Sequence, residues 1–156
     1  MRIAVGATAL LLACLIPCPV LADVAIVVHP ENPEVGLPAE ELLRILRQEQ
    51  RRFRTGGSIY LVFQGSGSPA RDLVLRRLLR MNDLELKQFW LAKLYRGEIA
   101  SFPRVLDSDV AVRRLVAVAP QAIGFLDASA VDATVKVLRI DGKLPGQTGY
   151  LLAGAR

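Results

Sequence analysis

Residues 65–68, Gly-Ser-Gly-Ser, have the composition in this sequence best suited to binding chemistry. Glycines let backbone N–H groups turn toward a ligand, and the serine hydroxyls add further donors. The loop follows an apolar run that ends at Phe63 and precedes Pro69, which favours a helix start with its partial positive charge. This combination favours small anions. The alternative is that Ser68 only caps the helix, which stabilises a fold by about 1 kcal/mol.

No comparable pattern of residues indicates catalysis or metal binding. The single histidine, His29, follows an apolar run without a cysteine nearby, so a structural role is favoured over a general base. Both cysteines, Cys14 and Cys18, precede residue 23, which leaves the rest of the chain without thiolate or disulfide chemistry. The downstream aspartates show no metal-site spacing: Asp107, Asp109, Asp127 and Asp132. We therefore predict no enzyme activity, no cofactor and no metal site.

Residues 1–22 have the pattern of a signal peptide. Arg2 precedes an apolar run over 3–16, two prolines follow, and Val-Leu-Ala at 20–22 offers a cleavage site. The run is shorter than the ~20 apolar residues that span a bilayer. We expect cleavage after Ala22 and export of residues 23–156 to the periplasm or the medium, as one domain.

Two alternatives to cleavage after Ala22 stay open. One is a retained anchor. The other is lipidation: residues 11–14, Leu-Leu-Ala-Cys, loosely resemble a lipobox, and lipidated Cys14 would tether the protein to a membrane. The apolar run would then be unusually short. We predict membrane attachment only if Cys14 is lipidated.

The charge of the expected mature chain is modest. Without Arg2, 19 basic residues face 15 acidic ones in 134 of the 156 residues. This small excess of positive charge mildly favours anionic partners. It is too small to indicate nucleic-acid binding, and we predict no nucleic-acid partner. A chain of this length can bury a sizeable core without disulfides.

The elements that position the loop alternate between strand-like and helix-like segments. Short runs rich in β-branched residues predict strands at 24–29, 58–63, 122–126 and 135–140. Four helix patterns begin near Pro38, Pro69, Asp83 and Ser108. The first continues into the basic stretch 47–54. The third ends at Tyr95, and we predict that its Phe89 and Trp90 lie in the core. The continuous apolar run at 24–29 indicates a strand buried on both faces. We therefore predict an α/β fold with a sheet covered by helices.

Several stretches resemble, in order, the phosphate-type substrate-binding proteins of ABC transporters. The matching segments are 27–33, residue 37 with 40–46, the loop 65–68, 119–125, and 135–142 followed by 149–151. This resemblance implies one lobe of a type II periplasmic-binding-protein-like fold, a mixed sheet flanked by helices. The family has two lobes with the ligand between them, and the expected mature chain has room for one.

The resemblance also implies ligand contacts. The family's loop is Gly-Ser-Gly-Thr, which carries Ser66, Gly67 and Ser68 over as phosphate contacts. The arginine and acidic residue that accompany the family's loop are replaced here by Val62 and Gln64. Arg71, one turn into the helix, is our own candidate for the missing cation.

Two functions agree with this pattern. The first is weak binding of phosphate or a similar oxyanion, because micromolar affinity needs about 8 kcal/mol and a one-sided, exposed loop offers less. The second is a ligand-free module that binds a protein partner in the cell envelope.

Overall fold

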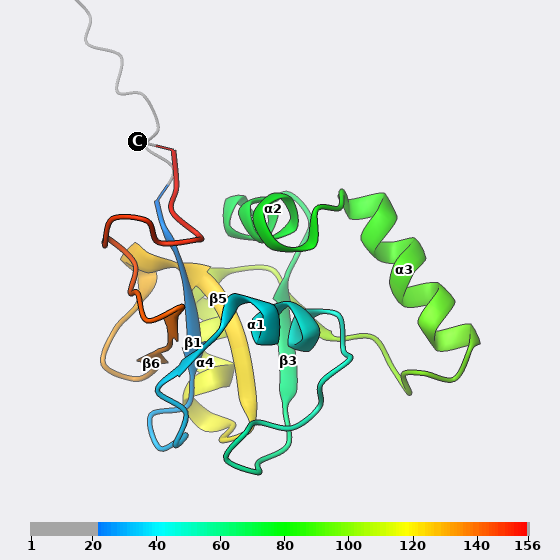
Figure 1. Cartoon of the computed structure of the whole chain (residues 1–156), viewed down its shortest axis with the longest axis horizontal. Coiled ribbons are helices and arrows are strands. Elements are labelled where there is room, and N and C mark those ends of the chain that lie inside the picture. The colour runs from blue at the N-terminus through cyan, green and yellow to red at the C-terminus, as the bar shows by residue number, and fades with distance from the viewer. Residues whose placement is uncertain (1–21, 156) are drawn as a thin grey trace, which may run out of the picture.

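The computed structural model describes residues 22–155 (Figure 1). Its strands are β1 Val24–Val28, β2 Gly36–Leu37, β3 Tyr60–Gln64, β4 Arg104–Leu106, β5 Ala122–Asp127, β6 Lys136–Val137 and β7 Arg139–Ile140. Its α-helices are α1 Ala39–Leu46, α2 Pro69–Val74, α3 Asp83–Tyr95 and α4 Asp109–Val118, and α2 continues as a π-helix over Leu75–Leu79. Residues 1–21 of the predicted signal peptide (1–22), with Cys14, lie outside the described residues.

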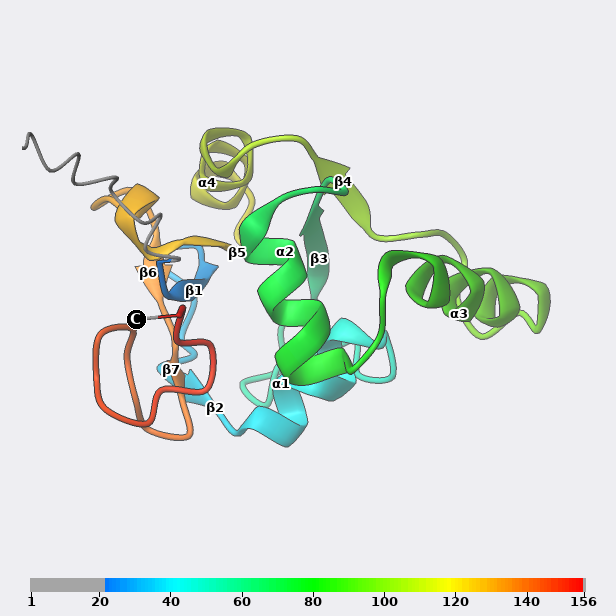
Figure 2. The ribbon, with the colours of Figure 1, turned by 90° about the horizontal axis from the view of Figure 1, so that it is seen from above.

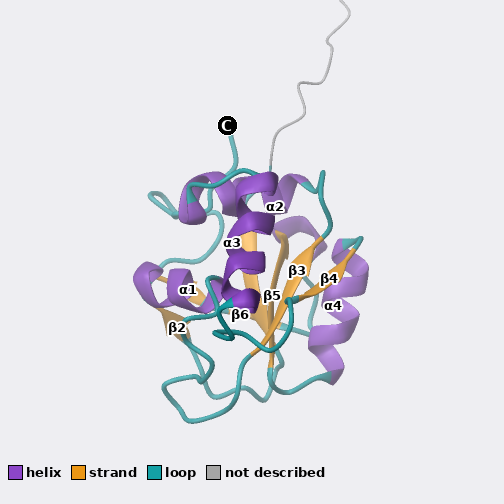
Figure 3. Cartoon of the chain, turned by 90° about the vertical axis from the view of Figure 1, so that its right-hand side faces the viewer, coloured by secondary structure: helices purple, strands orange, loops and turns teal. Residues whose placement is uncertain are grey.

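Five strands form a mixed sheet in the order β4-β3-β5-β1-β6. β3 runs parallel to β4 and β5, whereas β1 runs antiparallel to β5 and β6. α1 and α4 lie on opposite sides of the sheet (Figure 3), and α2 lies on the side of α1 (Figure 2). The predicted α/β class and the mixed sheet flanked by helices are confirmed.

Strand β1 shows why the sheet needs two helical layers. All five of its residues are buried, as the unbroken apolar run predicts. Ala25 and Val27 pack in the core with α4, while Val24, Ile26 and Val28 pack in the larger core with α1 and α2. Alternate side chains of a strand point to opposite faces, so each face needs its own apolar cover.

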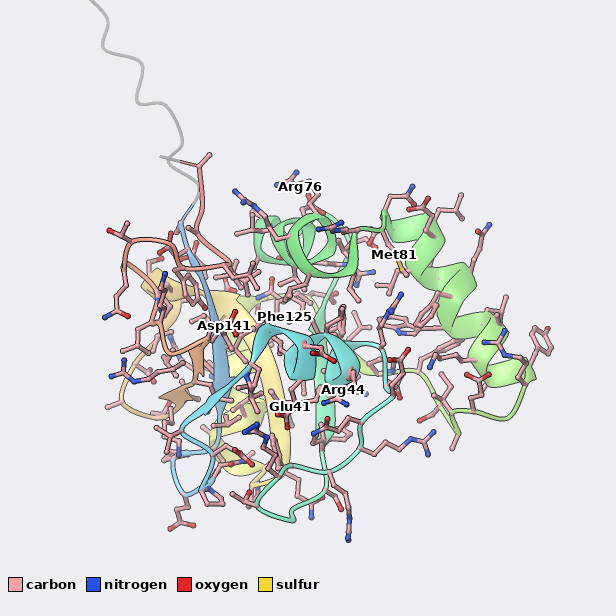
Figure 4. The ribbon with its side chains drawn as sticks, viewed as in Figure 1. Glu41, Arg44, Arg76, Met81, Phe125 and Asp141 are labelled. Atoms are coloured by element: carbon pink, nitrogen blue, oxygen red, sulfur yellow. The ribbon has the colours of Figure 1, made fainter. Side chains whose placement is uncertain are left out.

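Local signals place two of the helices well. Asn82 and Glu85 form a reciprocal capping box at the start of α3, and Ser108 accepts a hydrogen bond from the Ala111 N–H at the start of α4. At α1, the Ala39 N–H donates to the carboxylate of Asp141 at 2.9 Å, and Figure 4 labels this aspartate. These contacts satisfy N–H groups that a helix start leaves free.

Two predicted boundaries are wrong. α1 ends at Leu46 instead of continuing into 47–54, and Gln48 just beyond it has a left-handed φ of 55°. The predicted strand over 135–140 is two short strands, β6 beside β1 and β7 beside β2. Between them Leu138 is fully buried, so the chain changes partners where this side chain enters the core. The short strands β2 and β4 were not predicted.

An aromatic cluster fixes α3 against the sheet. The Phe63 ring contacts the Trp90 ring edge-on at 4.9 Å and the Phe125 ring at 5.1 Å (Phe125 is labelled in Figure 4). Trp90 is 4% exposed and Phe89 is half-buried, which confirms their predicted place in the core. In the part of the chain that the structure describes, no helix has the length and apolar character needed to cross a membrane.

Candidate anion-binding site

The loop 65–68 lies between the end of β3 and the start of α2, beside the end of β4 (Figure 2). The Gly65 N–H donates to the Leu106 carbonyl at 2.9 Å. A Cβ at residue 65 would lie 2.8 Å from a carboxylate oxygen of the exposed Asp107, so a larger residue here would require this side chain to move. Gly67 adopts a left-handed φ of 86°, which turns the chain into the helix.

The loop presents unused backbone donors to solvent. Ser66 and Gly67 are exposed, and neither of their N–H groups donates to any residue within 22–155. The Ser68 N–H is already bonded, to the Gly65 carbonyl at 3.3 Å. Adjacent N–H groups at a left-handed turn form a concavity that suits an anion.

Ser68 acts as the helix cap. Its hydroxyl accepts from the Arg71 N–H at 3.3 Å and donates to the side-chain oxygen of Gln64. The predicted capping role is therefore confirmed. A hydroxyl has one proton to donate, so a ligand contact from Ser68 would require it to release Gln64. That contact stays a prediction.

The buried side chain of Gln64, at the end of β3, supports the loop through hydrogen bonds. It is 2% exposed, and its amide nitrogen donates to the Asp109 carboxylate and, at 3.3 Å, to the Phe125 carbonyl. Both neighbours accept only, which leaves the amide oxygen to accept from Ser68. Sequence reasoning noted Gln64 only as a departure from the family and missed this role. A glutamine at the end of an apolar strand was the available signal.

Val62 has no part in the loop. It is fully buried in the core against α4, on the face of the sheet away from α1. Here the family's arginine position holds a core residue, so the loop gains no cation from β3.

Arg71 lies close to the loop with its charge already paired. The side chain is 3% exposed, and its guanidinium donates to Asp83 at 2.7 Å and to the Gln64 carbonyl at 2.6 Å. It also lies 5.8 Å from the centre of the Phe63 ring. The structure thus brings Arg71 together with Ser66 and Ser68, but as a support of the loop. Its predicted contact with a ligand remains untested.

Asp83 connects the loop to α3. Partial burial raises the pKa of its carboxyl, but hydrogen bonds from Ser66 and Arg71 and the charges of Arg71 and Lys87 outweigh this effect, so the pKa lies below 3.8. The carboxylate is therefore ionised at neutral pH. It offsets the positive charge that Arg71 brings near the loop.

A pocket of about 360 Å³ adjoins the loop. Its lining comes from the loop, from the α2 and α3 helices, and from β4 with the segment that leads into it: Ser66, Arg71, Lys87, Trp90, Leu91, Phe102 and Val105. Sequence reasoning missed this pocket because its apolar wall is far from the loop in sequence.

The residues considered for other chemistry lie in structural positions. His29 Nδ1 accepts a hydrogen bond from the Glu31 N–H at 3.2 Å. Over residues 22–155, no group of three or more histidine, cysteine or acidic side chains is placed to hold a metal ion.

Comparison with known proteins gives a clear result for the fold alone. Neither a scan of protein-family models nor a search of curated proteins gives a match. Solved structures do match. An ABC-type phosphate transport receptor from Vibrio cholerae has a TM-score of 0.69 and 23% identity, covering 86% of this chain and 55% of that one.

Two further structures agree with it. The phosphate-binding protein PstS from Borrelia burgdorferi has a TM-score of 0.66 and 16% identity, covering 86% of this chain and 55% of its own. A phosphate ABC transporter substrate-binding protein from Clostridium perfringens, with bound phosphate, has a TM-score of 0.65 and 20% identity. The match covers 81% of this chain and 49% of that one. The chain therefore spans about half the length of these proteins, and it has the fold of one lobe of the phosphate-type substrate-binding proteins.

Proposed function

We propose that this chain, which has the fold of one lobe of the phosphate-binding receptors, is exported and binds phosphate or a similar small oxyanion weakly at loop 65–68. The observation that carries the proposal is the pair of exposed N–H groups of Ser66 and Gly67, which no described residue accepts. They stand at a left-handed turn before a helix, on the fold of proteins that bind phosphate. Residues 1–22 direct export in this proposal, and residues 23–156 form the mature domain.

The roles within the loop differ. Ser66 and Gly67 make the direct contacts through their two N–H groups, and the Ser66 hydroxyl adds a third contact only by releasing the Asp83 carboxylate. Ser68 and Arg71 hold the loop in shape, and each reaches the ligand only by exchanging a hydrogen bond that it now makes. The proposal is for binding without catalysis.

The number of donors sets the affinity. A hydrogen bond to a charged group contributes about 1.5–3 kcal/mol and a helix start about 0.3–1 kcal/mol. Even three such bonds and the helix start give only about 5–10 kcal/mol. The cost of association removes about 4 kcal/mol or more, which leaves less than the ~8 kcal/mol of a micromolar complex. Because Asp83 neutralises Arg71, the loop has no free guanidinium to add. We therefore expect a dissociation constant in the millimolar to high micromolar range for residues 23–156, and tighter capture only with a second wall opposite the loop.

A second candidate function is a ligand-free interaction module in the cell envelope. The buried Val62 and the fully engaged Gln64 favour it, because both replace groups that would hold an anion in the family. This function predicts no response to small anions and one reproducible partner in cross-linking pull-downs. A pull-down without an enriched partner would count against it.

A matched pair of glycine variants tests the first proposal. Gly67 (φ 86°) and Gly56 (φ 103°) both have left-handed backbones with open space where a Cβ would stand. Valine strains both turns similarly, but only Gly67→Val disturbs the anion loop. We expect Gly67→Val, alone or with Ser68→Ala, to abolish the phosphate-induced amide shifts seen by NMR, and Gly56→Val to keep them. Equal titrations for both glycine variants would contradict the proposal.

A further inference from the structure

The pocket beside the loop gathers exposed apolar side chains from two separate elements. Leu91 of α3, Val105 of β4 and Phe102 before it are 44%, 43% and 46% exposed, and all three line this one hollow. Trp90 completes the apolar wall. Exposed apolar residues scattered singly need no explanation, but a concave group of them indicates a binding surface.

Charged groups lie along the edge of the same pocket. Arg71 and Lys87 line it together with the hydroxyl-bearing Ser66, and Asp83 stands directly behind them. Asp83 is ion-paired with Arg71, while Lys87 forms no ion pair with a residue of the described chain. Among the residues that line the pocket, Arg71 is therefore neutralised by Asp83, and Lys87 is a cation without an ion pair within residues 22–155.

The walls are held rigidly before any ligand arrives. The Arg71 guanidinium is fixed by Asp83 and by the Gln64 carbonyl, and the Trp90 ring is fixed against Phe63. The buried Trp90 Nε1–H has no hydrogen-bond partner within residues 22–155.

We infer that this pocket binds a small organic monoanion with a compact apolar body, such as a short-chain or aromatic carboxylate. The apolar body lies against Trp90, Leu91 and Phe102, and the carboxylate lies at Lys87 and Ser66. The volume of about 360 Å³ is in the range of small-molecule pockets. Bare phosphate would leave the apolar wall uncovered. The inference does not depend on phosphate binding by the loop amides, although Ser66 borders both places.

The fluorescence of Trp90 provides a direct measurement, because it is the only tryptophan of the sequence. The purified protein is titrated with hexanoate, with 1-hexanol as the neutral analogue and with acetate as the carboxylate without an apolar body. We expect a saturable change with hexanoate at a concentration about tenfold or more below the other two, because both apolar burial and charge contribute. Equal responses to hexanol and hexanoate, or no saturable response to hexanoate, would overturn the inference.

Matched variants locate the binding. Leu91 and Leu84 are both exposed leucines of α3, and only Leu91 lines the pocket. We expect Leu91→Gln to weaken hexanoate binding about five- to tenfold and Leu84→Gln to leave it unchanged. Lys87→Gln should weaken hexanoate about threefold without changing hexanol, whereas Arg114→Gln on α4 should change neither. Equal effects within either pair would place the binding elsewhere.

Gly67→Val separates this site from the phosphate loop. The variant should lose the phosphate-induced shifts and keep the hexanoate response, since residue 67 does not line the pocket. Loss of both responses in a folded Gly67→Val protein, judged by its amide spectrum, would mean one shared site and would overturn the inference of a separate pocket.

Discussion

Two glycine-containing loops of this protein present backbone N–H groups in opposite ways. In the C-terminal segment, the N–H groups of Gly146 and Gly154 donate to the carboxylate of Asp23 at 2.6 and 3.0 Å. In loop 65–68, the N–H groups of Ser66 and Gly67 meet no acceptor among residues 22–155. The same kind of donor is thus filled by the protein's own anion in one loop and open to solvent in the other.

The C-terminal segment 146–154, here called the clamp, is bound to the start of β1 by further hydrogen bonds. The Tyr150 hydroxyl donates to the Val24 carbonyl at 2.7 Å, and the Val24 N–H donates to the Leu152 carbonyl at 2.9 Å. Burial, with a smaller effect of the Asp23 charge, raises the pKa of Tyr150, so its hydroxyl stays protonated as a donor. These bonds tie the C-terminal segment to the start of β1. A set of amides that is internally satisfied therefore stabilises the fold, and an open one is the candidate for binding.

The largest expected effect comes from emptying the filled loop. Asp23→Ala removes a charged acceptor from two backbone donors, and we expect the free energy of unfolding to fall by about 2–4 kcal/mol. Urea denaturation measures this change. Asp23→Asn keeps one acceptor oxygen and should recover part of the loss. Unchanged stability in Asp23→Ala would show that the clamp contributes little.

A smaller loss is expected beneath the open loop. Asp83→Asn removes the charged partner of the buried Arg71, and we expect a loss of about 1–2 kcal/mol at pH 7, because Asp83 is partly exposed and its ion pair is screened. The same change leaves the Arg71 charge uncompensated, so phosphate affinity should rise about two- to fivefold. Lower phosphate affinity would contradict the neutralising role given to Asp83.

The Asp83 effect also depends on pH in a defined direction. The folded pKa lies below the ordinary 3.8, so the ionised carboxylate stabilises the fold fully above that value, and the contribution disappears as the pH falls through the folded pKa. The stability difference between wild type and Asp83→Asn should therefore be largest above about pH 5 and shrink toward zero below 3.8. A difference that grows in acid would contradict this assignment.

Tyr150→Phe should destabilise the C-terminal segment less than Asp23→Ala does. It removes one buried hydrogen bond to Val24 while keeping the ring, and we expect a loss of about 1 kcal/mol in the free energy of unfolding. The phosphate response of loop 65–68 should be unaltered, which chemical shift titration can check. A changed phosphate response would mean that the two loops are coupled.

Ser66→Ala has the smallest expected effect. It removes one hydroxyl but keeps both N–H groups, so phosphate affinity should fall only about two- to fivefold, with stability nearly unchanged. Ser101→Ala, at an exposed serine outside the loop, is the control. A complete loss of binding in Ser66→Ala would show that the hydroxyl, not the backbone, carries the affinity.

How far the sequence predicts this structure depends on the range of the interactions. The bounds of α3 were predicted because its caps lie within the helix and the residue before it. The strand predicted over 135–140 was divided incorrectly, because the change of partner after β6 depends on β1 and β2, far away in the chain.

The candidate site also has local features, which the sequence predicts, and long-range features, which it does not. The turn at loop 65–68 and the cap at Ser68 are local features, and the sequence predicted them. The hydrogen bond from Gln64 to Asp109 spans 45 positions, so the glutamine was visible in the sequence but its partner was not. The pocket joins α3 to β4 and the segment before it, and no local pattern could indicate it. The pairing of Arg71 with Asp83 likewise required the position of α3.

One titration tests the contrast between the two loops most directly. Phosphate is added to the isotope-labelled protein while amide NMR follows both loops, with sulfate as the comparison anion. We predict saturable shifts at Ser66 and Gly67 and none at Gly146 and Gly154, whose N–H groups are held by Asp23. Equal shifts in both loops, or none at Ser66 and Gly67 in a well-folded protein, would contradict the claim that loop 65–68 is an open anion site.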